Sequence, residues 1–594
     1  MVLAPLLLIL AAEAGLRIVG WGYPTGFCLS VEGGTVCVDN GRFLYQFYSP
    51  GTNLRPNPFR LVTPKPAGTV RVVVLGESAA MGTPDPAYGL SRFLQAMMLR
   101  QFPGKRIEVV NAAVRGINSH IIRAIASDCA RLEPDLYVVY MGNNEAVGLH
   151  APGPGSGFLI RHLSLLRAIQ AARSSRIGQV LAPAVRKWSS APGLVEEQDA
   201  DFFRKHRLAA DDPRRVAVFE NFERNLQDIL ESCTRCGAKV LLATVPVNEA
   251  DCPPLGSLHR EGLTADQAAA WERSFDDGVR LAKECKFEEA SRSFQAALAL
   301  DDHYAELHFR LAQCDVAQAR WDAARDHFSA ARDWDAMPFR AGTASNRIVK
   351  DLAAAWRERG VMLADVAAGV ARSALSPHGI PGDALFYDHV HTTFAGTHLV
   401  ASELMPGICE ALGSSVGAAR LAGKLPSVRE CAGLLGYGVV AEAQARAAMI
   451  KMMAAPPFTE QFDHAERQAR TQEALKASFG GLSQKDVDDA LNGLKAVSAA
   501  AAAKDWHALF NLARLHMTFG KPALALEHYD GAFRLMPHYL PGRLGLANAL
   551  FAVGRVTEAE RLVEEALTED PKSRDALAAM AQIRGNGGLR ANAR

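Results

Sequence analysis

The sequence predicts an α/β protein, in which helices flank a parallel sheet, with all-α helical repeats both inserted into this domain and appended to it. Two observations predict this fold class. Short apolar runs alternate with helical patterns over residues 70–412, as they do in successive βαβ units. A spacing of 34 residues then recurs over 267–336 and 505–585, and a period of that length is typical of stacked helix pairs.

The composition is that of an ordinary globular protein. The chain has 594 residues, of which 49% are hydrophobic and 22% charged, and its net charge is +1. This balance, with no basic patch that contains aromatic residues, argues against a nucleic-acid partner. The ten cysteines lack zinc spacing. Cys233 and Cys236 close a helical pattern and are interpreted as structural, whereas Cys28 and Cys37 are placed to pair across a hairpin in an oxidising compartment.

Residues 1–22 are predicted to form a membrane anchor, and residues 23–69 an N-terminal extension. Val2–Ala12 is an unbroken apolar run, and Glu13 and Arg17 follow at a spacing that lets them pair on one helix face. The run is shorter than the roughly 20 apolar residues that span a bilayer, so a start upstream of Met1 is one interpretation. No basic residue precedes the run as in a signal peptide. A buried or disordered helix is the alternative.

Five runs are predicted to be strands of the sheet. The first, Val70–Leu75, is rich in β-branched residues and almost wholly apolar, which suits a strand buried on both faces. The others are 106–112, 136–142, 239–245 and 361–366. Right-handed crossovers place the carboxyl ends of all these strands at one edge, and ligands bind beyond that edge in such folds.

Two other segments interrupt or follow the alternation. Within 151–210, PGPGSG (152–157) is predicted to be a flexible loop, and 158–176 an amphipathic helix with arginines at 161, 167, 173 and 176. We expect this helix to cover the site as a lid, with contact to a membrane surface as the alternative. Residues 413–504 are alanine-rich and are predicted to be a helical linker, ending in the alanine run after Ser498.

The 34-residue spacing predicts tetratricopeptide repeats. In 267–336 the equivalent pairs are Phe287 and Trp321, Ala290 and Ala324, and Phe294 and Phe328. In 505–585 they are Gly520 and Gly554, Ala525 and Ala559, Ala532 and Ala566, and Pro537 and Pro571. Small residues where two helices cross, large apolar residues in the second helix and a terminal proline match this repeat. Such arrays offer surfaces for protein partners.

Four sets of polar residues follow strands of the predicted sheet. Ser78 follows the first strand in VVVLGESAAMG, Gly116 the second and Asn144 the third, and Asp388 and His391 come after the fifth. A serine hydrolase needs a hydroxyl, an imidazole to take its proton and a carboxylate to orient the imidazole. It also needs donors aimed at the developing oxyanion. The alternative interpretation is that these residues are helix caps and turn residues.

These blocks resemble those of the SGNH (GDSL-type) hydrolases, in the family's order: GES at 76–78, Gly116, GNN at 142–144 and DHVH at 388–391. The resemblance implies a flavodoxin-like three-layer sandwich over 70–266 and 337–412. It makes Ser78 the nucleophile, His391 the general base and Asp388 its orienting carboxylate. It also implies an oxyanion hole formed by the backbone N–H groups of Ser78 and Gly116 and the side chain of Asn144.

More narrowly, MGNNEAVG, DCPPLGSLHR, DAMPFR and HGIPGD resemble bacterial proteins that join an apolar N-terminal helix to an SGNH domain with inserted and appended repeats. Glu77 and Glu145 stand where the family usually has Asp, and they are candidates for contacts behind the catalytic residues. His389 is expected to be a supporting or surface residue. Arg340 is a candidate for binding an anionic substrate group, with a salt-bridged arginine as the alternative.

The resemblance implies hydrolysis of O-acyl esters, O-acetyl esters above all, of carbohydrate, cell-envelope or lipid substrates through an acyl-enzyme, with no metal and no cofactor. One alternative is an O-acyltransferase that uses the same triad. Another is a repeat scaffold whose SGNH domain has little activity. Envelope substrates would place an inner-membrane-anchored protein with its catalytic domain outside the cytoplasm, and a cytoplasmic location is the alternative.

Overall fold

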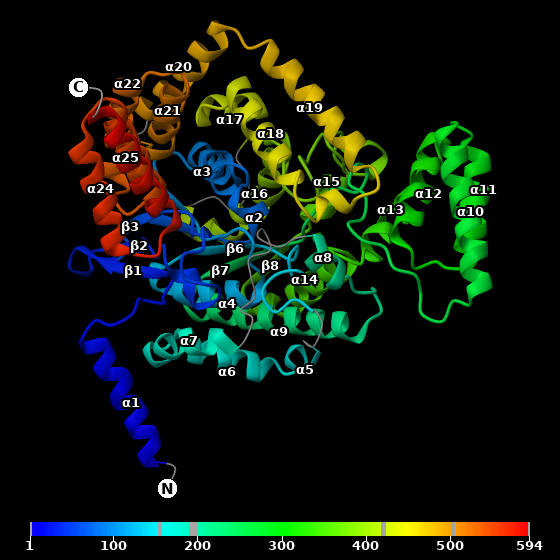
Figure 1. Ribbon diagram of the computed structural model, residues 1–594, viewed down its shortest axis with the longest axis horizontal. Helices are drawn as coiled ribbons and strands as arrows, with labels where there is room; N and C mark the ends of the chain where they lie inside the picture. The colour runs from blue at the N-terminus through cyan, green and yellow to red at the C-terminus, as the bar shows by residue number, and fades with distance from the viewer. Residues whose placement is uncertain (1–2, 153–156, 189–199, 417–422, 501–504, 592–594) are drawn as a thin grey trace.

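The computed structural model describes residues 3–152, 157–188, 200–416, 423–500 and 505–591. Most of the predicted PGPGSG loop and of the alanine run after Ser498 lies outside these ranges. At the centre is a sheet of five parallel strands, in the order β5-β4-β6-β7-β8 (Figure 1). Their bounds are β4 Thr69–Gly76, β5 Arg106–Asn111, β6 Leu136–Tyr140, β7 Lys239–Ala243 and β8 Val361–Ala364. All five predicted strands are therefore present, within two residues of the expected ends.

The strand order is 2-1-3-4-5 when the five strands are numbered along the chain, which is one of the common doubly wound orders. The register brings the carboxyl ends of β4, β6, β7 and β8 level with one another. Gly76 pairs with Tyr140, Tyr140 with Ala243, and Ala243 with Ala364. Chain segments that leave these strands therefore start side by side, at successive spacings of about 4.8 Å.

Helices cover both faces of the sheet. Alternate residues of β4 point to opposite faces, so Val72 and Val74 lie in one apolar core and Val73 and Leu75 in the other. The first core is closed by α3 (Leu90–Gln101), α15 (Val366–Ala371) and α16 (Phe394–Val416). The second is closed by α4 (Ser119–Cys129), α9 (Pro213–Arg235) and α14 (Thr343–Ala355). The result is three layers, α/β/α.

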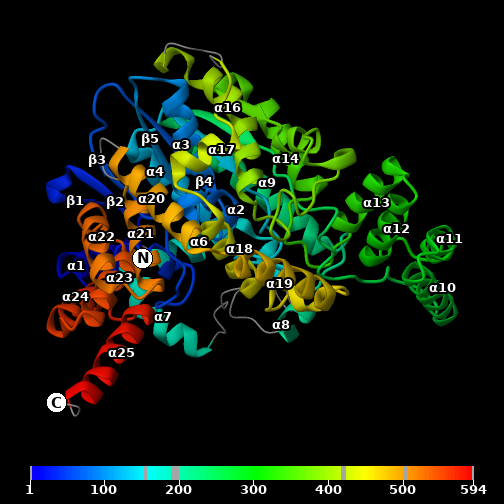
Figure 2. The same cartoon turned by 90° about the horizontal axis from the view of Figure 1, so that it is seen from above.

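The inserted repeats leave this domain between β7 and α14 and stand out from it (Figures 1 and 2). They comprise α10 (Ala265–Lys283), α11 (Phe287–Leu298), α12 (Ala305–Ala317) and α13 (Trp321–Asp333). The entering and leaving chains are joined at a neck, where the Ala336 N–H donates to Gly256 O (2.9 Å). The Asp335 carboxylate accepts N–H bonds from Leu255, Gly256 and Met337 at 2.9–3.0 Å.

Backbone geometry repeats with the same 34-residue period. The turn between paired helices needs a left-handed residue, which is Gly520 (φ +67°) and Gly554 (φ +88°) in the C-terminal array. In the inserted array the equivalent residues are Cys285 (φ +57°) and Ala319 (φ +55°). The small residues at the helix crossings, Ala290, Ala324, Ala525 and Ala559, are fully buried. The interpretation of the spacing as close helix crossing is thus confirmed.

The C-terminal array packs on the N-terminal extension. It consists of α21 (Trp506–Thr518), α22 (Pro522–Leu535), α23 (Leu540–Ala552), α24 (Val556–Glu569) and α25 (Arg574–Ala591). The extension forms a small antiparallel sheet of β1 (Cys28–Val31), β2 (Val36–Asp39) and β3 (Arg60–Val62). The Tyr45 hydroxyl donates to Asp570 Oδ2 (2.5 Å), and His538 Nε2 lies 2.8 Å from Asp39 Oδ1. Part of this array is therefore covered.

The segment predicted to be a linker also belongs to the folded body. Its helices are α17 (Val428–Leu435), α18 (Val439–Met453), α19 (His464–Gly480) and α20 (Gln484–Ala500), with the short 3-10 helix η8 (Phe458–Glu460) between α18 and α19. Cys431 and Leu435 of α17 are buried in the core that α3 and α16 close. The segment thus packs on the α/β domain over part of its length.

The prediction of a lid over 158–176 is wrong. This region forms α5 (Gly157–Ile160) and α6 (Leu163–Ser174), followed by α7 (Arg176–Trp188). Arg167 of α6 donates to Asn225 Oδ1 (3.1 Å) and lies 2.9 Å from Asp228 Oδ2, both on α9. The helix therefore forms an outer layer over α9 (Figure 1). An amphipathic pattern shows that one face is buried, but it does not show against what.

Two predictions for the N-terminal part, a disulfide and a membrane anchor, can be compared with the structure. Cys28 and Cys37 do lie on adjacent strands of a hairpin, but both are free thiols. The apolar N-terminal run forms α1 (Leu3–Ile18). Among the described residues, no helix combines the length and the apolar character that crossing a membrane requires.

Candidate functional site

Ser78 lies at the carboxyl edge of the sheet, where β4 turns directly into the short helix α2 (Ser78–Met81). The turn requires a glycine before it. A Cβ atom at Gly76 would come within 2.1 Å of the Tyr140 carbonyl oxygen on β6, far inside van der Waals contact. The Ser78 side chain is partly exposed at this edge, whereas Glu77 beside it is buried.

The Glu77 carboxylate holds the turn that carries Asn144. It accepts backbone N–H bonds from Asn143 (2.9 Å) and Asn144 (3.2 Å) and a longer one from Gly142 (3.4 Å). Burial, followed by the nearby charge of Glu145, raises the pKa of Glu77, and the backbone N–H groups only partly offset this rise. The longer side chain at this position thus reaches from the end of β4 to the segment after β6.

Glu145 has a similar role on the other side of the turn. Its carboxylate accepts from the Ser119 hydroxyl (2.7 Å) and the Ser119 N–H (3.0 Å) at the start of α4. The Asn144 side-chain amide donates to the Ile117 carbonyl at 3.0 Å. Gly116, with φ +68°, is in the same loop. The two glutamates and Asn144 therefore fix the loops after β4, β5 and β6 relative to one another.

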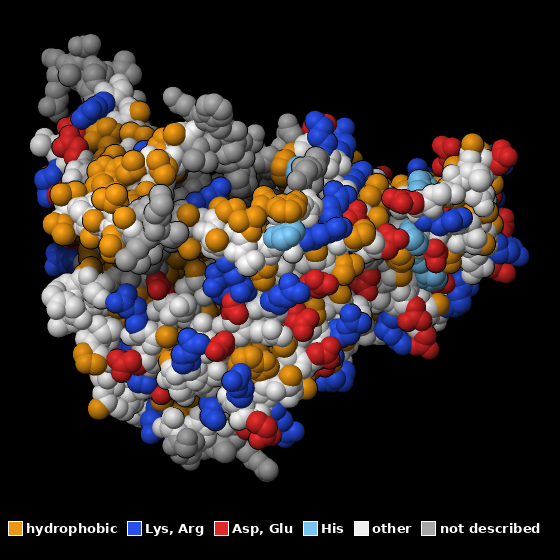
Figure 3. Space-filling view, turned by 90° about the horizontal axis from the view of Figure 1, so that it is seen from below, with side chains coloured by type: hydrophobic (Ala, Val, Ile, Leu, Met, Phe, Trp, Pro, Cys, Tyr) orange, Lys and Arg blue, Asp and Glu red, His pale blue; other side chains and the backbone are white. Residues whose placement is uncertain are grey.

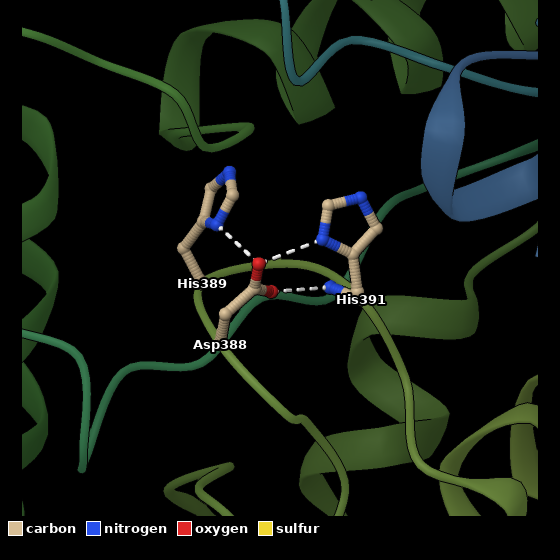
Figure 4. Close-up of side chains that lie close together, drawn as sticks. All are labelled: Asp388, His389 and His391. Carbon is tan, nitrogen blue, oxygen red and sulfur yellow. Dashed lines mark hydrogen bonds and ion pairs between the residues drawn. The ribbon is translucent and has the colours of Figure 1, made fainter. Parts of the chain in front are cut away.

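Asp388 and His391 form a buried pair. His391 Nδ1 lies 2.7 Å from Asp388 Oδ2, and the His391 N–H donates to Oδ1 at 2.8 Å (Figure 4). The Val390 N–H also donates to Oδ1, at 2.9 Å. His389 approaches the same Oδ2, with its Nδ1 3.0 Å away. The backbone bonds fix the carboxylate, and the carboxylate fixes the plane of the His391 ring.

The two imidazoles keep Asp388 ionised. Burial alone would raise the pKa of this carboxyl, but the charges of His389 and His391 and the hydrogen bond from His391 outweigh burial and hold its pKa well below the ordinary value. Burial lowers the pKa of His389, and the charge of Asp388 offsets that only in part. An ionised carboxylate accepts Nδ1–H, which leaves Nε2 of His391 as the basic nitrogen.

His391 Nε2 is buried and has no hydrogen-bond partner among the described residues. An orphaned buried nitrogen is uncommon and calls for an explanation. The Ser78 hydroxyl is not among the partners of His391 in this structure. Of the predicted site residues, the structure brings Asp388, His389 and His391 into direct contact, and it links Glu77 to Asn144. Among the described residues, no hydrogen bond or ion pair joins these two groups to each other.

Asn248, which the sequence analysis did not single out, joins the Asp388 loop to the sheet. It follows β7 and is fully buried. Its side-chain amide donates to Asp388 O (2.8 Å), and its N–H donates to His389 O (2.9 Å). The Asp388 loop is therefore held beyond the end of β7, two strands from Ser78. The sequence signal available for Asn248 was the position of an asparagine shortly after the fourth strand, in VPVN.

Arg340 supports this arrangement from behind. Its Nη1 donates to Asn248 O (2.8 Å) and Cys252 O (2.7 Å), and its Nη2 lies 3.5 Å from Asp335 Oδ2. The side chain is buried, so its donors are largely committed to the neck of the repeat insertion. This is the salt-bridged alternative of the sequence analysis, in a buried rather than a surface position.

One cluster in the described part of the chain has the side chains to bind a metal ion. Possible ligand atoms of Asp388, His389 and His391 all lie within 4.8 Å of one another. His391 Nδ1, however, is hydrogen-bonded to Asp388 Oδ2 at 2.7 Å, and His389 Nδ1 lies 3.0 Å from the same oxygen without a hydrogen bond. Once His391 donates Nδ1–H, the lone pair of its ring lies on Nε2, which faces away from the carboxylate. The observed arrangement is therefore an imidazole that a buried carboxylate orients.

Removing the Glu77 carboxylate is expected to destabilise the protein. In Glu77→Ala, up to three buried N–H groups lose their acceptor, at about 1–3 kcal/mol each, so we expect the free energy of unfolding to fall by about 3 kcal/mol. Chemical denaturation at pH 7 measures it. Glu77→Gln, which keeps one acceptor oxygen, should lose less. An unchanged midpoint in Glu77→Ala would contradict the role of Glu77.

The raised pKa of Glu77 predicts that the free energy of unfolding depends on pH. Its pKa is raised in the folded state from the ordinary value of 4.5, so the folded protein holds the proton more tightly than the unfolded chain. The stability that this bound proton contributes is present below pH 4.5 and is lost as the pH rises through the pKa of Glu77 in the folded state. The unfolding free energy of Glu77→Gln should therefore fall less steeply over this pH window than that of the wild type. Equal slopes would contradict the shift.

Comparison with known proteins identifies the repeats. The tetratricopeptide repeat family model matches residues 281–344 and 517–583. No curated protein matches the chain. Similar solved structures include the P58(IPK) TPR domain (14% identity, 54% of this chain and 67% of that one, TM-score 0.17) and the assembly chaperone of RpL4, Acl4 (14%, 54% and 98%, 0.18).

A third similar structure is the TPR2AB-domain:pHSP90 complex of yeast Sti1 (12% identity, 53% of this chain and 97% of that one, TM-score 0.15). All three TM-scores are too low to support a common overall arrangement, so the assignment depends on the family model and on the helix geometry above. Both predicted arrays contain a matched segment. The chain therefore carries tetratricopeptide repeats both inside and after its α/β domain.

Proposed function

We propose that the chain is a protein-interaction scaffold whose inserted repeats bind a protein partner. The observation that carries this proposal is the family match to both arrays, together with the position of the inserted one. The C-terminal array is partly covered by the N-terminal extension, whereas the inserted helices α10–α13 project from the body (Figure 2). Stacked helix pairs of this kind bind partners along an extended surface.

The neck of the insertion gives a direct test. Because Gly256 and Ala336 are hydrogen-bonded neighbours, residues 258–333 can be replaced by a short glycine-serine linker without stretching the α/β domain. We expect the full chain to retain a specific partner from its native cells in a quantitative cross-linking experiment, and the excised chain to lose it. An identical set of captured proteins for both chains would contradict the proposal.

A second function is proposed for the α/β domain: ester hydrolysis through a serine nucleophile. The observation that favours it is the His391 ring, oriented by Asp388 and left with an unpartnered Nε2 at the edge where Ser78 emerges. Ser78 follows β4, and Asn248 holds the Asp388 loop beyond the end of β7, two strands away in the sheet. The proposal requires Ser78 Oγ to come within hydrogen-bond distance of His391 Nε2.

In the proposed reaction, Ser78 Oγ attacks the ester carbonyl carbon while His391 Nε2 takes its proton. The carbonyl π-electrons move onto oxygen, near the N–H groups of Ser78 and Gly116 and the Asn144 amide. The alkoxide then leaves with the proton from His391, and water releases the acyl group by the reverse sequence. An acceptor hydroxyl in place of water would make the same site an O-acyltransferase. The resemblance to SGNH hydrolases supports O-acyl esters of carbohydrate, cell-envelope or lipid as substrates.

Hydrolysis of p-nitrophenyl acetate tests this function, and a chelator separates it from metal chemistry. We expect release of p-nitrophenol by the full chain and the same rate after exhaustive treatment with EDTA. Activity that EDTA abolishes and zinc restores would instead assign Asp388, His389 and His391 to a metal centre. A well-folded chain without any ester turnover would leave the scaffold as its function.

We further propose that the chain lies on a membrane surface through α1 and its neighbours. Exposed apolar residues gather on α1, on α5 and α6, and on α7; they include Leu7, Leu8, Ile9, Leu10, Phe158, Leu165, Val180 and Leu181. The Glu13 carboxylate accepts the N–H groups of Arg176 and Ile177, both at 3.0 Å, and so pins α1 to the start of α7. Figure 3 shows orange apolar and blue basic side chains together on this side of the molecule.

Vesicle sedimentation tests the membrane proposal. An amphipathic surface with arginines should bind vesicles that contain anionic phosphatidylglycerol more strongly than pure phosphatidylcholine. We expect Leu10→Asp to reduce the bound fraction severalfold. Leu577→Asp is the matched control, because Leu577 is similarly exposed (50% against 55%) but belongs to α25, which is not part of this surface. Equal binding by both variants would contradict the proposal.

A further inference from the structure

A cavity of about 240 Å³ lies beside the Asp388 loop. One wall is the chain just before Asp388, and the other walls are α18, η8 and the first turns of α19. The lining divides into two kinds of side chain. The apolar ones are Phe386, Met449, Ile450, Met453 and Phe458, and the basic ones are Arg446, His464, Arg467 and Arg470.

The cavity lies against the chain that carries the catalytic pair of the proposed esterase, although Asp388, His391 and Ser78 are not among its lining residues. The ring of Phe458 packs on that of His389, with centroids 5.2 Å apart. The Tyr387 N–H donates to His391 O at 2.8 Å. Asn248, which holds Asp388, also donates to the carboxylate of Asp383, a lining residue of the cavity (2.9 Å). A molecule in this cavity therefore lies next to the residues that orient His391.

More basic than acidic side chains line the cavity. Arg446 is paired with Glu442, at 2.6 Å. Arg467 donates to the neutral Gln461 amide oxygen (3.0 Å), and neither it nor Arg470 forms a salt bridge with a described residue. Asp383 is the one carboxylate among the lining side chains. The charges of Asp383 and of Asp463, which precedes His464, act on these arginines, but neither carboxylate forms a direct ion pair with them. Guanidinium groups without a direct carboxylate partner favour a phosphate or carboxylate in a bidentate arrangement.

The cavity is also braced by the inserted repeats. Arg310 of α12 lies over the ring of Phe462, 4.0 Å from its centroid, and Phe309 contacts the same ring. Phe462 stands between two lining residues, Gln461 and His464. This contact fixes the chain between η8 and α19, so the basic residues of α19 face a preformed apolar wall. Methionines at positions 449 and 453 let that wall adapt to a flexible chain.

From this arrangement we propose that the cavity binds a short alkyl or acyl chain that carries an anionic head, a phosphate or a carboxylate. The chain lies against the methionine and phenylalanine side chains, and the head is held by Arg467 and Arg470. Because the inference deepens the proposed esterase function, it identifies the substrate class: an ester whose acyl or alcohol part is amphipathic and anionic. It also gives the helical segment after α16 a role as a wall of the substrate site.

Isothermal titration calorimetry on the full-length Ser78→Ala protein tests binding without turnover. Hexyl phosphate and hexanoate are the probes, and hexanol and inorganic phosphate supply the chain and the head separately. We expect an anionic hexyl probe to bind at least tenfold more tightly than hexanol or inorganic phosphate. Arg470→Gln should weaken that binding by about tenfold. Lys476→Gln, which removes the same charge further along α19 outside the cavity, should leave it unchanged.

The outcomes separate the two proposals. If neither hexyl anion binds, or if Arg470→Gln and Lys476→Gln bind them equally, the cavity assignment is wrong even if the wild type hydrolyses p-nitrophenyl acetate. If a hexyl anion binds as expected while the wild type has no esterase activity, the cavity assignment stands and the esterase proposal fails. If inorganic phosphate binds as tightly as hexyl phosphate, the alkyl chain contributes nothing to binding and the proposed role of the apolar wall is wrong.

Discussion

Replacing Ser78 by alanine is expected to lower kcat for ester hydrolysis by about 10⁶-fold, to the level that binding and the oxyanion donors give alone. The proposed reaction forms its covalent bond at Ser78 Oγ, and no other hydroxyl is placed at the end of β4. Initial rates with p-nitrophenyl acetate measure the effect. Ser78 is partly exposed at the start of a short helix, so the substitution should leave the thermal midpoint nearly unchanged.

Ser478→Ala is the control for this variant, because Ser478 is an exposed serine on α19. It should keep wild-type kcat. A Ser78→Ala protein that retains more than about a hundredth of the wild-type rate would show that the hydrolysis arises elsewhere in the chain. The ester function of this site would then be withdrawn, and the repeat scaffold would remain.

Replacing Asp388 by asparagine is expected to lower kcat by about 10⁴-fold. The Asp388 carboxylate accepts from Nδ1 of His391 and thereby directs the lone pair of Nε2 toward the nucleophile. An amide can donate its own N–H to Nδ1, which stabilises the opposite tautomer and leaves Nε2 protonated. Because Val390 and His391 donate their N–H groups to Oδ1, the asparagine oxygen can keep those bonds and the fold should persist.

His389→Gln is the matched control for Asp388→Asn, since His389 contacts the same carboxylate oxygen. We expect it to change kcat by less than tenfold, whereas His391→Gln should abolish activity. If His389→Gln proves the more damaging variant, the general base has been assigned to the wrong imidazole.

The strands and the blocks at their ends were predictable from the sequence for a clear reason. A strand buried on both faces must be apolar along its whole length, so runs such as Val70–Leu75 stand out against amphipathic helices. Parallel strands also bring their carboxyl ends to one edge, which makes the residues after each strand neighbours. Ser78, Asn144 and the Asp388 loop reach that edge for this reason.

Other features depend on contacts that leave no local pattern. Asn248 acts on Asp388 across 140 residues, and a single asparagine carries no periodic signal. The cavity wall of α18 and α19 is built from an alanine-rich segment whose composition predicts helices but not their neighbours. The prediction of a lid over 158–176 was wrong for the same reason, because the apolar face of that helix could pack equally well against α9. Buried polar bonds, such as those of Glu77 to residues 142–144, likewise require the fold to be known.

The most direct test of the central claim is covalent labelling of the full-length protein with a fluorophosphonate, followed by peptide mass spectrometry. Such a probe reacts with a serine hydroxyl only when a neighbouring base activates it. We predict a phosphonate adduct on Ser78 in the wild type, and none in Ser78→Ala or His391→Gln. A folded wild-type protein that stays unlabelled at Ser78, or that is labelled equally well without His391, would contradict the convergence of Ser78 and His391.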